Sequence, residues 1–197
     1  MVIGITGGIA TGKSAFCEQL RALLPATFFD ADQAGRDLTK ADPEVKELIA
    51  RSFGPEIYSA VGDLNRAQLR TIVFADPEKK RALEQILHPR IRRQWAVEAE
   101  SRRKSTELFL ADIPLLYETG GEALCDRVVV VACSPRLQLQ RLMARSSLSL
   151  SAAREMISAQ MPLTEKIARA DHVVWNNGPL TALAGQAEVL AALWRQQ

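Results

Sequence analysis

The sequence predicts an α/β fold in which helices wrap a five-stranded parallel sheet. Short, almost continuously apolar runs alternate with helical segments, as in parallel strands that are covered on both faces. A glycine-rich turn joins the first run directly to the first helix. Between the second and third runs, roughly seventy residues lack strand character and are too long for a simple crossover, which predicts an inserted helical region.

The first strand and helix flank the glycine-rich turn. Residues 2–5 predict a buried strand, and the helix after the turn is expected to run to about Leu24, since a proline follows. Residues 27–29 predict a second strand, which leads into Asp30 and Asp32. Ligands of open α/β sheets bind at this carboxyl edge.

Capping residues followed by proline divide the inserted region into helices. Asp42-Pro43 and Asp76-Pro77 each combine an N-cap with a proline at the first helical position. The expected helices cover residues 43–53, 66–74, 77–87 and 91–103, with an interruption at His88-Pro89.

Strands return in the second half of the chain. Three further strands are expected, at residues 108–112, 128–131 and 172–175. The helices expected here are 135–145, 152–161 after a polar break at 146–151, about 164–170, and a closing helix after the turn at 176–179.

Composition excludes several classes of protein. The 197 residues are 47% hydrophobic and carry a net charge of +2, which gives no reason to expect nucleic-acid binding. Three cysteines without CxxC spacing and two histidines provide no metal-ligand cluster. The longest strongly apolar run, 128–133, is too short for a membrane span, and no signal peptide precedes the first strand, so we expect a cytoplasmic protein.

The glycine-rich turn matches the phosphate-loop pattern of a glycine, four residues and Gly-Lys-Ser. Backbone N–H groups and the positive end of a helix dipole converge there, which suits a polyphosphate such as that of ATP. The ammonium of the lysine can reach the β- and γ-phosphates, and the serine hydroxyl can bind Mg²⁺. The residues expected to bind ATP in this turn are Gly7, Gly8, Ile9, Ala10, Thr11, Gly12, Lys13 and Ser14.

Other motifs in the sequence distinguish among the classes of phosphate-loop protein. The Asn-Lys-x-Asp motif with which GTPases read guanine is absent, and Asp112 is followed by Ile113 rather than by the Glu of many ATPases. Short length and a helical insertion after the second strand favour a kinase of a small acceptor. In such a kinase a later segment closes over ATP.

Three acids are candidates for chemistry. Asp30 or Asp32 can orient an acceptor hydroxyl and accept its proton, or can simply cap the next helix. Asp112 stands where an acid that organises Mg²⁺ is expected, although a turn acid fits equally well.

Basic residues cluster in the second half of the chain. Of the arginines around the polar break, Arg141 and Arg145 are the candidates to contact the transferring phosphate, whereas a solvated helix face explains most such runs.

His88 is expected to be a helix-break residue, and Trp95 and Trp175 to be packing residues.

The order of these motifs resembles the dephospho-CoA kinase family along almost the whole chain. The matching blocks are Thr6 to Ser14, Asp30-Ala31-Asp32 with Arg36, Leu64-Asn65-Arg66 with Leu69, Leu87-His88-Pro89, Ile113 to Glu118, Gln138 to Arg145, and Gln160, Lys166, Ala170-Asp171 and Asn176-Asn177. The family usually has Gly-Ser where this chain has Ala10-Thr11.

This resemblance implies ATP-dependent phosphorylation of the ribose 3′-hydroxyl of dephospho-CoA, which gives coenzyme A. It implies a P-loop kinase with a helical acceptor-binding insertion and a helical lid. The implied parts are a core of 1–33, 105–140 and 171–197, an acceptor region of 34–104 and a lid of 141–170. A nucleoside monophosphate kinase and a nucleotide-binding regulatory module are the alternatives.

The resemblance also assigns residues. The implied catalytic residues are Asp32 as base, Lys13, Arg141 and Arg145; Asn177 joins the ATP site; Asp30, Asp32, Arg36, Arg66 and His88 bind the acceptor; Ser14 holds Mg²⁺, and Asp112 is a further candidate ligand. The implied partners are ATP and dephospho-CoA, with no nucleic acid or membrane, and the protein is expected to be a monomer or a weak oligomer.

Overall fold

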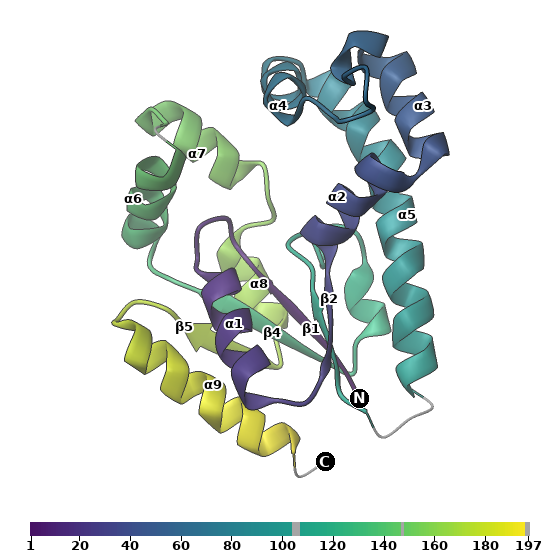
Figure 1. Ribbon diagram of the computed structural model, residues 1–197. Coiled ribbons are helices and arrows are strands. Elements are labelled where there is room, and N and C mark those ends of the chain that lie inside the picture. Colours follow the sequence, from purple (N-terminus) through teal and green to yellow (C-terminus); the bar gives the residue numbers. More distant parts are fainter. Residues whose placement is uncertain (104–106, 147, 196–197) are drawn as a thin grey trace. The chain divides into compact units, whose positions relative to one another are not determined.

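The computed structural model describes residues 1–103, 107–146 and 148–195. Within these residues a five-stranded sheet has the order β2-β3-β1-β4-β5 (Figure 1). The strands are β1 (Val2–Gly7), β2 (Thr27–Asp30), β3 (Phe109–Asp112), β4 (Arg127–Ala132) and β5 (His172–Trp175). The predicted α/β fold and all five predicted strands are confirmed.

The register of the parallel strands brings their carboxyl ends together. β1 pairs in parallel with both β3 and β4, so that Ile5 lies opposite Asp112 and Gly7 lies opposite Val131. β4 pairs in parallel with β5. Every residue of β1 and β3 is buried, because helices cover both faces of a central parallel sheet. The end of β1, where the glycine-rich turn begins, therefore lies beside the ends of its two neighbours.

Clustering of contacts divides the chain into two compact units. The first, residues 1–29 and 98–197, contains the sheet. In it α1 (Lys13–Leu23) packs against α9 (Leu180–Trp194), and their apolar faces join the strands in one core that includes Phe16, Leu20 and Trp194. The other elements of this unit are η2 (Gly121–Leu124), α6 (Pro135–Ser146), α7 (Leu150–Ser158) and α8 (Leu163–Arg169).

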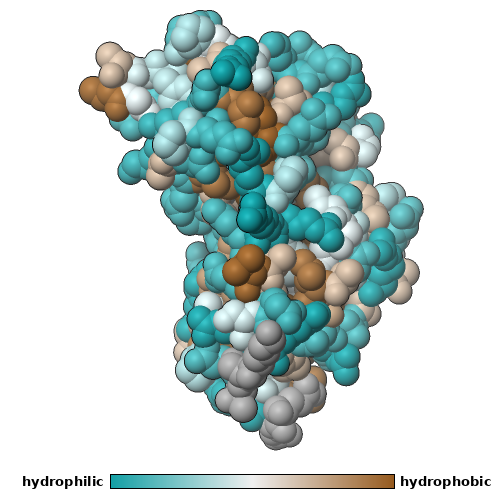
Figure 2. All heavy atoms as spheres, turned by 90° about the vertical axis from the view of Figure 1, so that its right-hand side faces the viewer, coloured by the Kyte–Doolittle hydropathy of each residue, from teal (hydrophilic) through white to brown (hydrophobic). Residues whose placement is uncertain are grey.

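The second unit, residues 30–97, is helical and has its own core. It comprises α2 (Ala31–Ala41), α3 (Pro43–Phe53), η1 (Pro55–Ile57), α4 (Arg66–Ala75) and most of α5 (Pro77–Arg103). The predicted caps at Asp42 and Asp76 are confirmed, because each carboxylate accepts the N–H groups two and three residues further on. Asn65 also caps α4, by accepting the N–H of Gln68. Hydrophilic residues predominate on the face of the molecule shown in Figure 2. Ion pairs between residues four apart, Glu47 with Arg51 on α3 and Lys80 with Glu84 on α5, contribute charges to the surface of this unit.

The predicted break at His88-Pro89 is wrong, because α5 is continuous from Pro77 to Arg103. A proline inside a helix removes one hydrogen bond and crowds the carbonyl four residues earlier. The flanking residues Ile86 and Ile91 pack into the core of the helical unit, and that packing outweighs the lost bond. Trp95 is buried as predicted.

Two smaller predictions also differ from the structure. Ser149 caps α7, so this helix begins at Leu150, inside the predicted polar break, and ends at Ser158 rather than at residue 161. Trp175 is 46% exposed and is not a buried packing residue. Ser147 and the expected boundary at 104 and 105 lie outside the described residues. Among the helices that are described, none is long and apolar enough to cross a bilayer.

The proline within α5 gives a stability prediction. Pro89 is exposed, so Pro89→Ala removes little buried surface while it restores a backbone donor. We expect the free energy of unfolding to rise by about 1–3 kcal/mol, measured by urea denaturation. Gln85→Ala, an exposed site on the same helix, serves as control and should change stability by less than about 0.5 kcal/mol. A lower stability of Pro89→Ala would contradict this account of α5.

Candidate active site

The phosphate loop, residues 7–14, connects β1 directly to α1 (Figure 1). Gly12 precedes the helix with φ of 94°, and because it has no side chain it leaves the first N–H groups of α1 available to an anion. Ala10 also has a positive φ, 59°, which costs a residue with a Cβ roughly 1–2 kcal/mol. This is the position at which the family that the chain resembles usually has glycine.

Two glycines of the loop are required by close packing. A Cβ on Gly7 would lie 2.5 Å from the carbonyl oxygen of Val131, on the neighbouring strand. A Cβ on Gly12 would lie 2.0 Å from Nδ2 of Asn176. Val131 on β4 and Asn176 just after β5 therefore pack directly against the phosphate loop.

Lys13 forms an ion pair with Asp112, which ends β3. Both side chains are largely buried, and the register of β1 and β3 brings them together. The thiol of Cys17, one turn along α1, donates to the other carboxylate oxygen of Asp112 at 3.4 Å. Burial and the nearby Asp112 carboxylate raise the pKa of Cys17 well above its usual range, so this thiol stays protonated at neutral pH.

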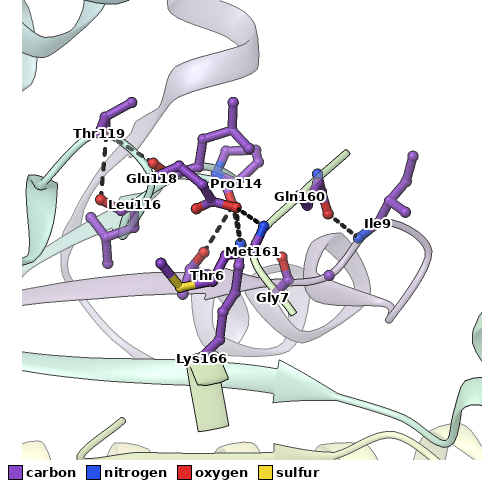
Figure 3. Close-up of polar contacts among 12 residues, drawn as sticks. Thr6, Gly7, Ile9, Pro114, Leu116, Glu118, Thr119, Gln160, Met161 and Lys166 are labelled. Carbon is purple, nitrogen blue, oxygen red and sulfur yellow. Dashed lines mark hydrogen bonds and ion pairs between the residues drawn. The ribbon is translucent and has the colours of Figure 1, made fainter. Parts of the chain in front are cut away.

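Two glutamines from the later part of the chain, one on α6 and one between α7 and α8, hold Ile9 at the tip of the loop. Oε1 of Gln160 accepts the N–H of Ile9 at 2.9 Å (Figure 3). Nε2 of Gln138, on α6, donates to the carbonyl of Ile9 at 2.9 Å. Both backbone groups of this residue are therefore fixed by side chains more than a hundred residues away in the sequence.

Asn176 and Thr11 fix the second half of the loop. Nδ2 of Asn176 donates to the carbonyl of Thr11 at 3.0 Å, and the hydroxyl of Thr11 donates to the carbonyl of Gly8 at 2.8 Å. Asn176 and Thr11 are both buried. These contacts restrain the backbone of the loop at Gly8 and Thr11.

Of the residues predicted to contact ATP from later in the chain, Arg141 and Asn177 contact the turns that follow β4 and β5. Nη1 of Arg141 donates to the carbonyl of Asn176 at 3.0 Å. Arg145, near the end of α6, is exposed. Asn177 is exposed, and its Oδ1 accepts the N–H of Ser134 at 2.7 Å. Burial raises the pKa of Cys133 beside them, and Arg141 partly opposes this shift.

The residues predicted to bind the acceptor belong to the helical unit. Asp30 caps α2 by accepting the N–H of Gln33, so the capping role that the sequence left open falls to Asp30 and not to Asp32. Asp32, in the first turn of α2, is exposed. Arg66 donates to the carbonyl of Arg36 and to the hydroxyl of Thr39.

His88 is half-buried within continuous α5 rather than at a helix break. The interpretation that it serves only to break the helix is therefore wrong. Its predicted contact with the acceptor stays a prediction.

The side chains near the loop offer hard oxygen ligands. Ser14 is exposed in the first turn of α1, and Asp112 lies beside Lys13. Mg²⁺ is commonly held by one or two protein oxygens together with substrate phosphates, and this donor set fits that pattern. In the described part of the chain, no group of three or more His, Cys, Asp or Glu side chains is placed to hold a metal ion by itself.

The residues that brace the loop were not singled out from the sequence as site residues. They are Gln138, Gln160, Lys166 and Asn176, with Glu118. Gln138 and Lys166 lie on helices and the other three lie in turns, where polar residues usually face solvent, so local pattern gives no reason to place them against the loop. Their presence in the blocks that resemble a known family was the one signal in the sequence.

Asn176 gives a test of this bracing. Asn176→Ala leaves the buried carbonyl of Thr11 without its donor, so we expect the Kd for Mg-ATP to rise about tenfold, measured by calorimetry. Gly178→Ala is the control, because its Cβ would meet only the Cβ of Ala182 at an ordinary 3.7 Å. Unchanged ATP affinity in a folded Asn176→Ala protein would show that the loop holds its shape without this contact.

Comparison with known proteins agrees with this geometry. The family model described as dephospho-CoA kinase matches residues 1–182. A dephospho-CoA kinase from Anaeromyxobacter dehalogenans is 46% identical over 194 residues, which cover 97% of this chain and 90% of the relative.

Solved structures are similar along their whole length. A protein from Thermus thermophilus superimposes with a TM-score of 0.74 at 36% identity, covering 98% of this chain and 97% of that one. A dephospho-CoA kinase from Campylobacter jejuni has a TM-score of 0.70 at 26% identity, with 98% and 96% covered. The chain therefore belongs to the dephospho-CoA kinase family.

Proposed function

We propose that this kinase transfers the γ-phosphoryl group of ATP to the ribose 3′-hydroxyl of dephospho-CoA, the last step of coenzyme A synthesis. The new bond joins the 3′-oxygen to phosphorus, the bond from phosphorus to the β,γ-bridging oxygen breaks, and the hydroxyl proton passes to a base. The products are coenzyme A and ADP. The observation that carries this proposal is a braced phosphate loop, with Lys13 held at its end, in a chain of this family.

The loop supplies the ATP side of the reaction. The loop N–H groups that are not already bonded to Gln160 or Gly8, together with those at the start of α1, would bind the β- and γ-phosphates, with Asn177 contributing to the same site. Lys13, which is paired with Asp112, would exchange that partner for phosphate oxygens. Ser14 and Asp112 would hold Mg²⁺, which neutralises phosphate charge when bound.

Two arginines are proposed to stabilise the transferring group. Arg141 and Arg145 lie one turn apart on α6, within the segment 141–170 that we propose as the lid. Guanidinium groups pair well with phosphate oxygens because they donate parallel hydrogen bonds. Arg141 already lies beside the turn at Asn176 that touches the phosphate loop.

Residues 34–104 are proposed to bind dephospho-CoA. Asp32 would accept the proton of the 3′-hydroxyl as the phosphoryl group leaves ATP. Asp30, Arg36, Arg66 and His88 would contact the acceptor. Both proposed substrates, ATP and dephospho-CoA, are water-soluble. We therefore propose that the enzyme works in the cytoplasm, without nucleic acid or membrane. We also propose that it is a monomer or a weak oligomer.

A panel of acceptors tests the proposal. The purified chain with ATP and Mg²⁺ is expected to convert dephospho-CoA to coenzyme A, followed by chromatography and ADP release. Adenosine, AMP and shikimate are the comparison acceptors. Phosphorylation of AMP without phosphorylation of dephospho-CoA would identify the protein as a nucleoside monophosphate kinase. Tight ATP binding without transfer to any acceptor would indicate a nucleotide-binding regulatory module.

Asp32 gives a prediction about the base. Asp32→Asn should lower kcat by about 10²- to 10⁴-fold, because the amide cannot accept the proton, while the Kd for ATP stays nearly unchanged. Asp37→Asn, a second exposed carboxylate on α2, is the matched control and should retain activity. Full activity in Asp32→Asn would remove this residue from the reaction.

A further inference from the structure

Lys166, on α8, is a fully buried lysine next to the phosphate loop. Its Nζ lies 2.8 Å from Oε1 of Glu118, 3.1 Å from the carbonyl oxygen of Pro114 and 3.5 Å from the carbonyl oxygen of Gly7 (Figure 3). An ammonium has three protons, and these acceptors match them in number. The carbonyl of Gly7 belongs to the first residue of the loop.

Glu118 connects this lysine to the segment between α7 and α8. The same Oε1 that pairs with Lys166 accepts the N–H of Met161 at 3.0 Å. Met161 follows Gln160, whose side chain accepts the N–H of Ile9. The carboxylate of Glu118 is therefore bonded both to Lys166, which contacts Gly7, and to the residue after Gln160, which contacts Ile9 (Figure 3).

Burial of this lysine requires an explanation, because its ammonium is withdrawn from water while the side chain of Glu118 remains 20% exposed. Removing an ammonium from water costs several kcal/mol, and well-packed apolar residues often replace a buried pair without loss of stability. An apolar side chain at position 166 would leave the carbonyls of Gly7 and Pro114 without this donor. The lysine is therefore better explained by what it does to the loop than by its contribution to stability.

The contact with Gly7 determines which way a peptide group faces. In a trans peptide the C=O and the following N–H point in opposite directions. When Lys166 holds the carbonyl of Gly7, the N–H of Gly8 must point away from the lysine. A flipped peptide would present a carbonyl oxygen, which repels phosphate, in place of that donor.

We propose that Lys166, held by Glu118, is a positioning residue that keeps the Gly7–Gly8 peptide oriented for phosphate binding. The identity of the nucleotide as ATP rests on the proposed function. The identity of the acceptor does not enter, because the contacts of Lys166 are to the phosphate loop, to Pro114 and to Glu118.

Lys166→Met tests the proposal, because methionine has a similar length without donors. We expect the Kd of the non-hydrolysable analogue β,γ-methylene-ATP to rise about tenfold or more, as expected for losing hydrogen bonds to buried carbonyls. The KM for ATP should rise in parallel, while the KM for dephospho-CoA changes by less than about twofold. Lys80→Met, which removes the same charge from an exposed site, is the matched control and should bind the analogue normally.

A milder variant covers the case in which Lys166→Met does not fold. Glu118→Gln keeps the shape of the side chain and an acceptor for Met161 but removes the charge that holds Lys166, so a three- to tenfold rise in the same Kd is expected. Glu165→Gln, an exposed carboxylate beside Lys166 on α8, is its control. A purely structural role would lower the melting temperature of these variants without raising the Kd of the folded protein, and that result would overturn the proposal.

The outcome is separable from that of the proposed function. If wild-type protein binds the analogue but does not phosphorylate dephospho-CoA, the acceptor assignment fails while analogue binding by the Lys166 variants still decides the positioning role. If dephospho-CoA is phosphorylated and Lys166→Met binds the analogue as tightly as wild type, the positioning role fails alone.

Discussion

The phosphate loop works only if its backbone donors face one point, and the structure around it serves that constraint. A glycine-rich turn is intrinsically free to adopt many conformations, so a single one must be enforced from outside. Parallel pairing of β1 with β3 and β4 provides the means, because it lines up the carboxyl ends of these strands. Asp112 at the end of β3, Val131 near the end of β4 and Asn176 just after β5 all contact the loop or its lysine.

Charge in this region is arranged in two separate pairs. Under the proposed function, nucleotide would exchange partners with the pair of Lys13 and Asp112, because the lysine stands at the end of the loop. Lys166 pairs with Glu118 and donates to two backbone carbonyls, which use all three protons of its ammonium. Both are lysine–carboxylate pairs, but their proposed roles differ. Lys13 would contact the phosphates of the nucleotide, whereas Lys166 would fix the orientation of the loop backbone. Ala10, which has a positive φ, adds local strain that this packing must hold in place.

The division into two units has a physical basis in separate cores. The sheet unit buries Phe16, Leu20 and Trp194 against the strands, whereas the helical unit buries Val45, Ile49 and Phe53 among its own helices. An insertion with its own core can vary to suit an acceptor without disturbing the phosphate loop. This separation suits the proposed division of labour, in which the sheet unit binds ATP and residues 34–104 bind the acceptor.

The sequence by itself determined the strands, most helix boundaries and the phosphate loop, because these depend on local patterns. Apolar runs, Asp42-Pro43 and the spacing from Gly7 to Ser14 act over a few residues, and the structure agrees with them. Tertiary packing decided what local patterns could not. It kept α5 continuous through Pro89, gave the cap of α2 to Asp30, and buried Gln138, Lys166 and Asn176 against the loop. Those contacts join residues more than a hundred positions apart, so their free energy exists only once the sheet has brought the segments together.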